Sequence, residues 1–183
     1  EDSTVVLVTG GSQGSRAINE AVLSALSERA NEPASARNVE ILWAAGPNNI
    51  ESINARLPGS ARSWVKTHGY ISNMPGAMAA SDVAISRAGA MATAELLAWG
   101  IPMVLIPLPT AAADHQAHNA RALANAGAAV MLEERALTPE LLWDTLTNVV
   151  SDVATRERMR VAALERARPN AAREIAAKLA QLL

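Results

Sequence analysis

The chain has no cysteine, which excludes disulfide bonds and thiolate metal sites and permits a reducing compartment. Its apolar runs are short: GIPMVLIPLP (residues 100–109) is broken by prolines, and no run reaches the roughly 18 residues of a membrane span. Arg and Lys are scattered and the net charge is −2, so no basic surface for nucleic acid is expected. Half of the residues are hydrophobic, which is enough for a substantial core.

Strand and helix patterns alternate along most of the chain. Strands are predicted at residues 4–9, 39–45, 64–68, 82–86, 102–107 and 128–132, and helices at 15–30, 48–57, 74–80, 90–99 and 113–126. VVLVT and MVLIP are apolar on both faces, as in a parallel sheet covered by helices on both sides. The pattern predicts an α/β fold, with a Rossmann-like, doubly wound parallel sheet of about six strands flanked by helices.

The segment 138–183 is predicted to be a helical tail. Thr138 suits an N-cap and Pro139 the first helical position. The ARPN stretch (residues 167–170) is expected to divide the tail into two helices, and RANEPASARN (residues 29–38) to form a loop. The chain starts without Met, a few residues before its first strand, so we expect residues 1–183 to be a single domain cut from a longer protein.

The first ligand-binding pattern is TGGSQGSRA (residues 9–17), a glycine turn between a strand and a helix. Such a turn lets free N–H groups of the helix face an anion, and Ser12 and Ser15 add hydroxyl groups. The segment lacks the Gly-Lys-Ser/Thr of a Walker A loop and does not fit G-x-G-x-x-G. The second strand also ends without an acid for an NAD ribose, so the pattern favours a phosphate other than that of NAD, or else a plain turn.

The second pattern is SRAGAMATAELLAWG (residues 86–100), in which Gly89 and Ala90 open a helix and Glu95 lies in its second turn. Small residues let a ligand approach the backbone. The Glu95 carboxylate has two oxygens that can accept hydrogen bonds from vicinal ribose hydroxyls. The alternative is that Glu95 is a solvated helix residue near the positive end of the dipole.

The third pattern is PLPTAAADHQAHNARAL (residues 107–123), where Gln116 and Asn119 share a helix face and offer amides to sugar hydroxyls. His115 and His118 are interpreted as surface histidines, since no third metal ligand is evident, and His68 as structural. No metal and no cofactor is predicted. All three loops follow strands at one edge of a parallel sheet, so together they predict a nucleotide-sugar pocket.

The segments GGSQGSRAIN, SRAGAMATAELLAWGIPMVLIPLP and DHQAHNARALANAGAA together resemble the C-terminal half of the MurG family, within glycosyltransferase family 28. The resemblance runs from about residue 5 to 135 and extends to the helical tail. It implies one half of a GT-B enzyme, with an α/β core over about 4–135 that binds the donor UDP-GlcNAc. The N-terminal half, which carries the surfaces for the lipid acceptor and the membrane, is absent from the sequence.

The resemblance also assigns donor-binding residues. It places Gly11, Ser12 and Gln13 near the diphosphate, and Tyr70 and Ile71 in the wall around the uracil. A second loop, near the diphosphate and the sugar, contains Arg87, Gly89, Ala90 and Met91. The acid on the ribose is Glu95, and the polar pair on the GlcNAc hydroxyls is Gln116 and His115.

Two positions depart from the family pattern. The family commonly has Thr where this chain has Ala92, with Thr93 one place later, so a hydroxyl directed at the ligand is in doubt there. His115 stands where an amide or a basic residue is frequent, which weakens its assignment to the sugar.

The implied activity is that of a hexosyltransferase that converts lipid I to lipid II in peptidoglycan synthesis, on the cytoplasmic face of the bacterial inner membrane. The acceptor hydroxyl displaces UDP from the sugar with inversion, and the family's candidate bases lie on the other half. The chain alone is therefore expected to be cytoplasmic and to bind donor without transferring sugar. The alternatives are a soluble donor-binding subunit of a two-chain transferase, or half of a UDP-GlcNAc 2-epimerase.

In this family the last helix crosses back to the N-terminal half. The apolar stripe Ile175, Leu179, Leu182 and Leu183 is therefore expected either to be exposed here or to pack on its own domain. If it is exposed, it favours self-association.

Overall fold

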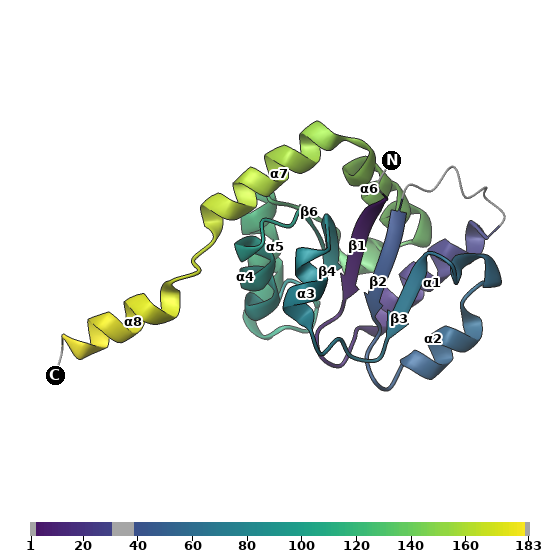
Figure 1. Cartoon of the computed structure of the whole chain (residues 1–183), viewed down its shortest axis with the longest axis horizontal. Coiled ribbons are helices and arrows are strands. Elements are labelled where there is room, and N and C mark those ends of the chain that lie inside the picture. Colours follow the sequence, from purple (N-terminus) through teal and green to yellow (C-terminus); the bar gives the residue numbers. More distant parts are fainter. Residues whose placement is uncertain (1–2, 31–38, 182–183) are drawn as a thin grey trace.

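A computed structural model describes residues 3–30 and 39–181. Its centre is a six-stranded parallel sheet with strand order β3-β2-β1-β4-β5-β6 (Figure 1). The strands are β1 (Thr4–Thr9), β2 (Val39–Ala44), β3 (Val65–His68), β4 (Val83–Ser86), β5 (Met103–Leu105) and β6 (Ala129–Met131). The chain order reverses direction between β1 and β4, which are hydrogen-bonded neighbours. The predicted fold class is confirmed.

Helices cover both faces of the sheet. They are α1 (Arg16–Glu28), α2 (Ile50–Arg56), α3 (Met74–Ala79), α4 (Ala90–Ala98), α5 (His115–Asn125), α6 (Pro139–Ser151), α7 (Val153–Arg166) and α8 (Ala171–Ala180). Short 3₁₀ turns are η2 (Gly59–Ala61), η3 (Ala112–Asp114) and η4 (Glu134–Ala136). Each predicted strand and helix of the α/β core lies within a few residues of its predicted position.

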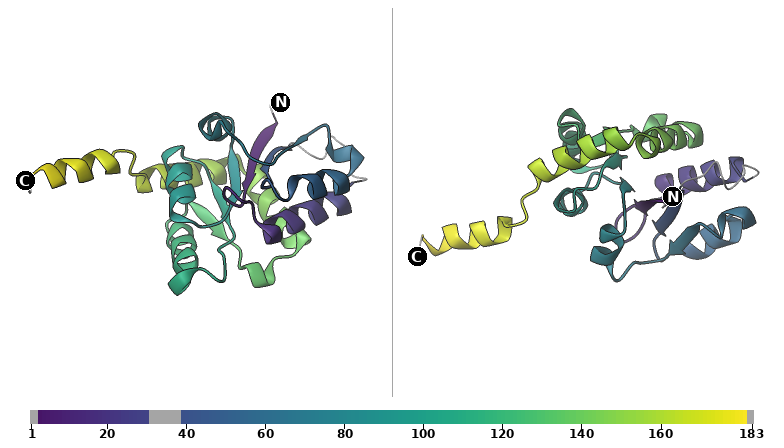
Figure 2. Two further views of the ribbon diagram at one scale, coloured as in Figure 1. Left: turned by 90° about the horizontal axis from the view of Figure 1, so that it is seen from below. Right: turned by 45° about the horizontal axis from the view of Figure 1, so that its top comes forward.

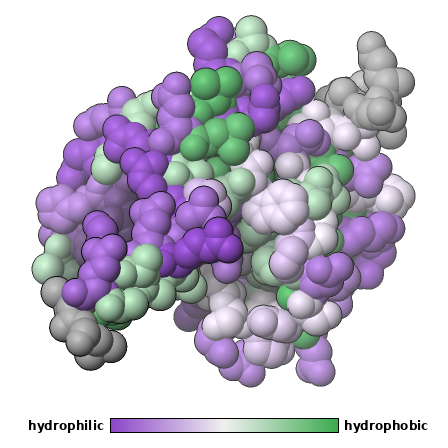
Figure 3. Space-filling view, turned by 60° about the vertical axis from the view of Figure 1, so that its left-hand side comes forward, coloured by the Kyte–Doolittle hydropathy of each residue, from purple (hydrophilic) through white to green (hydrophobic). Residues whose placement is uncertain are grey.

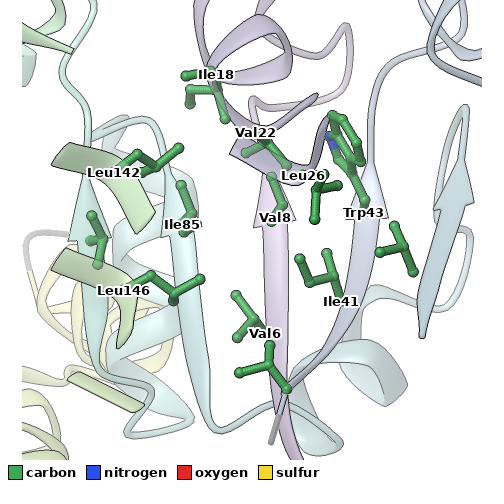
Figure 4. Close-up of a cluster of buried hydrophobic side chains, with 14 of the residues drawn as sticks. Val6, Val8, Ile18, Val22, Leu26, Ile41, Trp43, Ile85, Leu142 and Leu146 are labelled. Carbon is green, nitrogen blue, oxygen red and sulfur yellow. The ribbon is translucent and has the colours of Figure 1, made fainter. Parts of the chain in front are cut away.

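The core has two layers because side chains alternate across each strand. Val6 and Val8 of β1 point to the face covered by α1, α2 and α6, where they pack with Trp43, Leu142 and other buried residues (Figure 4). Leu7, between them, points to the opposite face, where α3, α4 and α5 pack. Both faces of β1 are therefore buried, as the apolar run VVLVT predicted.

Side-chain caps fix where several helices begin. Ser15 caps α1 by accepting from the Ile18 N–H, and Thr138 caps α6 by accepting from the Leu141 N–H. Each bond satisfies a backbone donor that the first turn leaves without a partner in the helix. These caps place the start of α1 at the carboxyl end of β1, and the Thr138–Pro139 helix start is confirmed.

The tail differs from the prediction of two helices. Asp152 adds a break, because its carboxylate caps α7 by accepting from the Thr155 N–H and hydroxyl. The tail therefore contains α6, α7 and α8. The predicted break at 167–170 is present as well, between α7 and α8. The predicted loop at 29–38 lies mostly outside the described residues.

Helix α8 projects away from the rest of the molecule in all three ribbon views (Figures 1 and 2). It has no buried residue, and Ile175 and Leu179 are 59% and 58% exposed. The alternative in which the stripe is exposed therefore holds for these two residues, whereas Leu182 and Leu183 lie outside the described residues. In Figure 3, where the end of the molecule that carries α8 comes forward, hydrophilic side chains predominate and hydrophobic ones lie in groups between them. Within the described ranges, no helix is long and apolar enough to cross a membrane.

Candidate functional site

A pocket of about 880 Å³ lies at the carboxyl ends of β1 and β4, where the strand order reverses. Ligands of open parallel sheets bind at this switch point. The volume lies in the range of ~300–1,000 Å³ that is usual for cofactors and drug-sized ligands. The wall is built from the loop after β1 and the start of α1, from the loop after β4 and the start of α4, and from single residues after β5 and β6.

The loop after β1 is shaped by glycines. Gly14 donates to the Gly11 carbonyl (2.9 Å), and both residues have positive φ, at +74° and +92°. A Cβ atom on Gly14 would lie 2.0 Å from the Ala45 carbonyl oxygen, so no larger residue fits between this loop and the end of β2. The close approach sets the loop back from the sheet edge and directs the N-terminus of α1 at the pocket.

The loop after β4 presents a second helix N-terminus to the same pocket. Gly89 is the N-cap of α4 in an extended conformation, and a Cβ atom there would meet no atom within 4 Å. Ala90, Met91 and Ala92 of the first turn line the pocket beside it. Two helix N-termini with their free N–H groups at one cavity make a site for an anion, above all for a phosphate chain.

Arg87, also on the loop after β4, is fully engaged. Its Nη1 donates to the carbonyls of Ile106 (3.1 Å) and Pro107 (3.2 Å), and its Nη2 lies 2.5 Å from Glu134 Oε2. The Arg87 and Glu134 side chains are only 12% and 26% exposed. Arg87 therefore ties together the segments after β4, β5 and β6, which form one side of the pocket.

Gln116 of α5 lines the pocket with one half of its amide already paired. Its Oε1 accepts from the Leu108 N–H at 3.1 Å, which leaves the NH₂ group as a donor for a ligand. Asn119 was expected to work with it, but its Nδ2 donates to the Ala88 carbonyl (3.1 Å) and holds α5 against the loop after β4. The predicted amide pair is thus reduced to Gln116.

Some predicted residues line the pocket and others lie outside it. Those that line it are Gly11, Arg87, Gly89, Ala90, Met91 and Gln116. Those that are not part of its wall are Ser12, Gln13, Tyr70, Ile71, Glu95 and His115. Ser12 and Gln13 are exposed at the turn between Gly11 and Gly14.

Glu95 lies one helical turn beyond the rim of the pocket. It follows Met91 by four residues and Ala92 by three, so the three share one face of α4. Its side chain is exposed and makes no hydrogen bond or ion pair with the residues that the structure describes. The carboxylate is therefore free to accept hydrogen bonds from a ligand that extends outward along α4.

Tyr70 and Ile71 follow β3, two strands away from β1 in the sheet. The Tyr70 ring is 65% exposed, and Ile71 packs against the core layer under α3 and α4. Both lie at the carboxyl edge, outside the pocket wall.

The Thr93 hydroxyl, one place after the position where the family commonly has Thr, is turned away from the pocket. Thr93 is buried, and its Oγ1 donates within the first turn, to the Gly89 and Ala90 carbonyls. Ala92, at the family's usual Thr position, lines the pocket with a methyl group. Thr93 therefore does not replace the missing hydroxyl.

The histidines are exposed, as expected for His115 and His118. His115 Nδ1 lies 2.8 Å from the Ala112 carbonyl, so Nδ1 carries the proton in this contact and Nε2 is left free. Ala113 and Asp114, directly before it, have the unusual φ values +48° and +53°. No group of three or more potential metal ligands occurs among the described residues.

Sequence reasoning missed three charged residues at the site: Arg16, Glu20 and Glu134. Arg16 stands inside the quoted glycine pattern but was not singled out. Glu20 accepts two hydrogen bonds from Arg56 of α2, at 2.8 and 2.7 Å, and these bonds lower the pKa of its carboxyl group. No local sequence pattern marks Glu134 as a site residue, because its partner Arg87 is distant in the sequence.

The geometry agrees with the comparison with known protein families. The family model of the glycosyltransferase family 28 C-terminal domain matches residues 5–179. The chain belongs to this family. The resemblance to glycosyltransferase family 28 is therefore confirmed.

Curated relatives carry the name UDP-N-acetylglucosamine–N-acetylmuramyl-(pentapeptide) pyrophosphoryl-undecaprenol N-acetylglucosamine transferase. The protein of Chlorobaculum parvum is 38% identical over 181 residues, which cover 99% of this chain and 48% of the relative. That of Salinibacter ruber is 42% identical over 177 residues, covering 96% and 46%. This family 28 chain thus spans about half the length of the curated relatives it matches.

A solved structure gives the same answer for the fold. MurG of Acinetobacter baumannii superposes with a TM-score of 0.85 and 30% sequence identity, over 99% of this chain and 52% of that protein. The six-stranded sheet with its helical tail is therefore the GT-B type of Rossmann-like fold, as predicted.

Proposed function

We propose that this chain is the donor-binding domain of a MurG-type GlcNAc transferase and that its pocket holds the diphosphate of UDP-GlcNAc. The observation that carries the proposal is the convergence of two helix N-termini, those of α1 and α4, on one cavity at the switch point of the sheet. Each helix N-terminus offers backbone N–H groups to an anion, so two of them at one cavity suit a ligand with two linked phosphates. The family to which the chain belongs supports the same ligand class.

The other predicted residues fit a donor that extends from this diphosphate. Glu95 would accept from the ribose hydroxyls one turn along α4, and the backbone near Tyr70 and Ile71 would meet the uracil. The free NH₂ of Gln116 would donate to a GlcNAc hydroxyl, and the exposed His115 would lie nearby. Gly11, Ser12 and Gln13 on one side, and Arg87, Gly89, Ala90 and Met91 on the other, would enclose the phosphates.

In the proposed reaction, an acceptor hydroxyl attacks the anomeric carbon of GlcNAc and UDP departs with inversion. The dipoles of α1 and α4 stabilise the negative charge that develops on the leaving diphosphate. The domain orients the donor, whereas a base that takes the acceptor proton would come from the other half of the enzyme. The chain alone is therefore expected to bind donor without transferring sugar.

The partners of the complete enzyme follow from the same proposal. They are an N-terminal domain, the lipid I acceptor that is converted to lipid II, and the cytoplasmic face of the bacterial inner membrane as a peripheral site. Self-association through the exposed Ile175 and Leu179 of α8 stays a prediction. No metal or cofactor is part of the proposed scheme.

Calorimetric titration of the chain with UDP-GlcNAc, UDP-GalNAc, UDP and NAD tests the proposal. Saturable binding of the UDP compounds and none of NAD is expected, with weaker binding in Glu95→Ala. Glu165→Ala is the matched control, because Glu165 is an exposed glutamate on α7 whose carboxylate makes no hydrogen bond to the described residues. Equal losses in both variants would contradict the ribose assignment, and NAD binding would contradict the donor class.

A further inference from the structure

Two arginines line the pocket, and of these only Arg87 has hydrogen-bond and ion-pair partners among the described residues. Arg87 is held by Glu134 and by the Ile106 and Pro107 carbonyls. These partners fix its guanidinium as a link between loops. Arg87 is therefore poorly placed to turn toward a ligand.

Arg16 is in the opposite state. It is the first residue of α1, its side chain is exposed, and it lines the pocket. Its guanidinium makes no hydrogen bond or ion pair with any residue in the described ranges 3–30 and 39–181. It thus adds a full positive charge at the helix end that already favours anions.

The carboxylate best placed to pair with Arg16 is hydrogen-bonded to another arginine, and Arg16 acts on it only through space, by helping to lower its pKa. Glu20 follows Arg16 by four residues, a spacing at which oppositely charged side chains pair on a helix. Both Glu20 oxygens instead accept from Arg56 of α2, at 2.8 and 2.7 Å, in a bidentate pair. Bidentate arginine–carboxylate pairs are among the strong ion pairs, so Glu20 stays with Arg56.

We propose that Arg16 is the cation that binds the diphosphate in this pocket, and that the Glu20–Arg56 pair keeps Arg16 available for it. The inference rests on the proposed donor site and names a side chain for it. A planar guanidinium donates to two phosphate oxygens at once, which a lysine at the same place does not match. The helix N-termini then supply backbone N–H groups, and Arg16 supplies the charge.

A diphosphate occurs in the nucleotide donor and also in a prenyl diphosphate such as the acceptor lipid carries. The pocket favours the donor, because the start of α4 lines it with the small residues Gly89, Ala90 and Ala92, which admit a polar chain close to backbone N–H groups. The test therefore compares UDP with farnesyl diphosphate, a prenyl diphosphate without a nucleoside.

Calorimetric titrations of wild type, Arg16→Ala and Arg16→Lys test the assignment. The Kd for UDP is expected to rise about tenfold in Arg16→Ala. It should rise by less in Arg16→Lys, which keeps the charge but loses the planar guanidinium that donates to two phosphate oxygens. The Kd for UMP, which lacks the second phosphate, should change less. Arg173→Ala, on the exposed helix α8, makes the same change in net charge and should leave UDP binding unaltered.

Arg56→Ala tests the role of the neighbouring pair. Arg56 is not part of the pocket wall, yet its removal releases Glu20 to pair with Arg16 and should weaken UDP binding about twofold. Adding Glu20→Gln to Arg56→Ala should restore wild-type affinity. A packing defect caused by the loss of Arg56 would not be restored by this second change.

The outcomes separate the two proposals. If wild type binds UDP and Arg16→Ala binds it equally well, the assignment of Arg16 is wrong and the donor site stands. If Arg16→Ala loses only farnesyl diphosphate, Arg16 serves a prenyl diphosphate and its assignment to the nucleotide donor is wrong, whereas the donor site again stands. If wild type binds neither UDP nor UDP-GlcNAc, the proposed function fails, and this inference fails with it. Urea midpoints equal to that of wild type show that the variants are folded.

Discussion

The guanidinium of Arg87 and the carboxylate of Glu134 form an ion pair across the carboxyl edge of the sheet, with Nη2 2.5 Å from Oε2. The pair links the loop after β4 to the turn after β6, and the two strands are separated by β5. Both residues also line the pocket. One contact therefore joins the stability of this edge to the shape of the candidate site.

Replacing Glu134 by Gln should destabilise the fold by about 1–3 kcal/mol, because a shielded arginine loses its charged partner. Urea unfolding followed by circular dichroism measures the change. Glu133→Gln is the matched control: its partner Arg135 is 84% exposed, so about 0.5 kcal/mol or less is expected. Similar losses in both variants would contradict a structural role for the Arg87–Glu134 pair.

Asn19 connects α1 to β2 inside the core. Its Nδ2 donates to the Ala45 carbonyl (2.7 Å), and its Oδ1 accepts from Trp43 Nε1 (3.1 Å). Asn19→Ala leaves the buried Trp43 N–H without a hydrogen bond and the Ala45 carbonyl with only the bond from Asn49 (3.1 Å), so a loss of about 1–3 kcal/mol is expected in urea unfolding. Asn170→Ala, at an exposed position whose side chain makes no cap bond, should change stability little. A loss below about 1 kcal/mol for Asn19→Ala would contradict the importance of this network.

Gly11 and Gly14 should respond differently to alanine. Both have positive φ, but a Cβ atom at Gly11 meets open space, whereas at Gly14 it would clash with the Ala45 carbonyl. Gly11→Ala should therefore cost only the conformational strain of about 1–2 kcal/mol. Gly14→Ala should cost more and should also weaken UDP binding, because the loop must move. Equal unfolding free energies for the two variants would show that the close approach at Ala45 does not restrict the loop.

Acid should remove the contribution of the Glu20–Arg56 pair. Hydrogen bonds from Arg56 lower the pKa of Glu20 below its ordinary value of 4.5. A carboxyl group with a lowered folded pKa stabilises the fold above its unfolded pKa, and this stabilisation is lost as the pH falls through the folded pKa. The urea midpoints of wild type and Glu20→Gln should therefore differ slightly at pH 7 and converge as the pH falls through the lowered folded pKa of Glu20. A constant difference would contradict the pairing.

The strands were predictable because β-branched and apolar runs such as VVLVT are typical of parallel strands buried on both faces. The ends of the strands were less predictable than their positions. Strand β5 spans Met103–Leu105 within the predicted 102–107, because its length depends on pairing with β4 and β6. The break at Asp152 was missed because it depends on one side chain turning back to the Thr155 N–H. Such a local choice is not visible in the helical pattern around it.

The position of the site was predictable, but its charge pattern was not. Glycine turns after strands locate the phosphate-binding loops, and the edge rule for parallel sheets brings them together. That Arg87 is engaged and Arg16 is free depends on Glu134 and Arg56, which lie far from them in sequence. Only the packing of α2 beside α1, and of the turn after β6 beside β4, determines these partners.

The central claim, that the diphosphate of a UDP ligand lies between α1 and α4, is tested most directly by two-dimensional NMR of the ¹⁵N-labelled chain titrated with UDP. The amide signals of residues 15–17 and 89–92 should shift most, because these residues line the pocket at the N-termini of α1 and α4. Signals of α8 should remain in place. Shifts confined to other segments, or none at saturating UDP, would contradict the account.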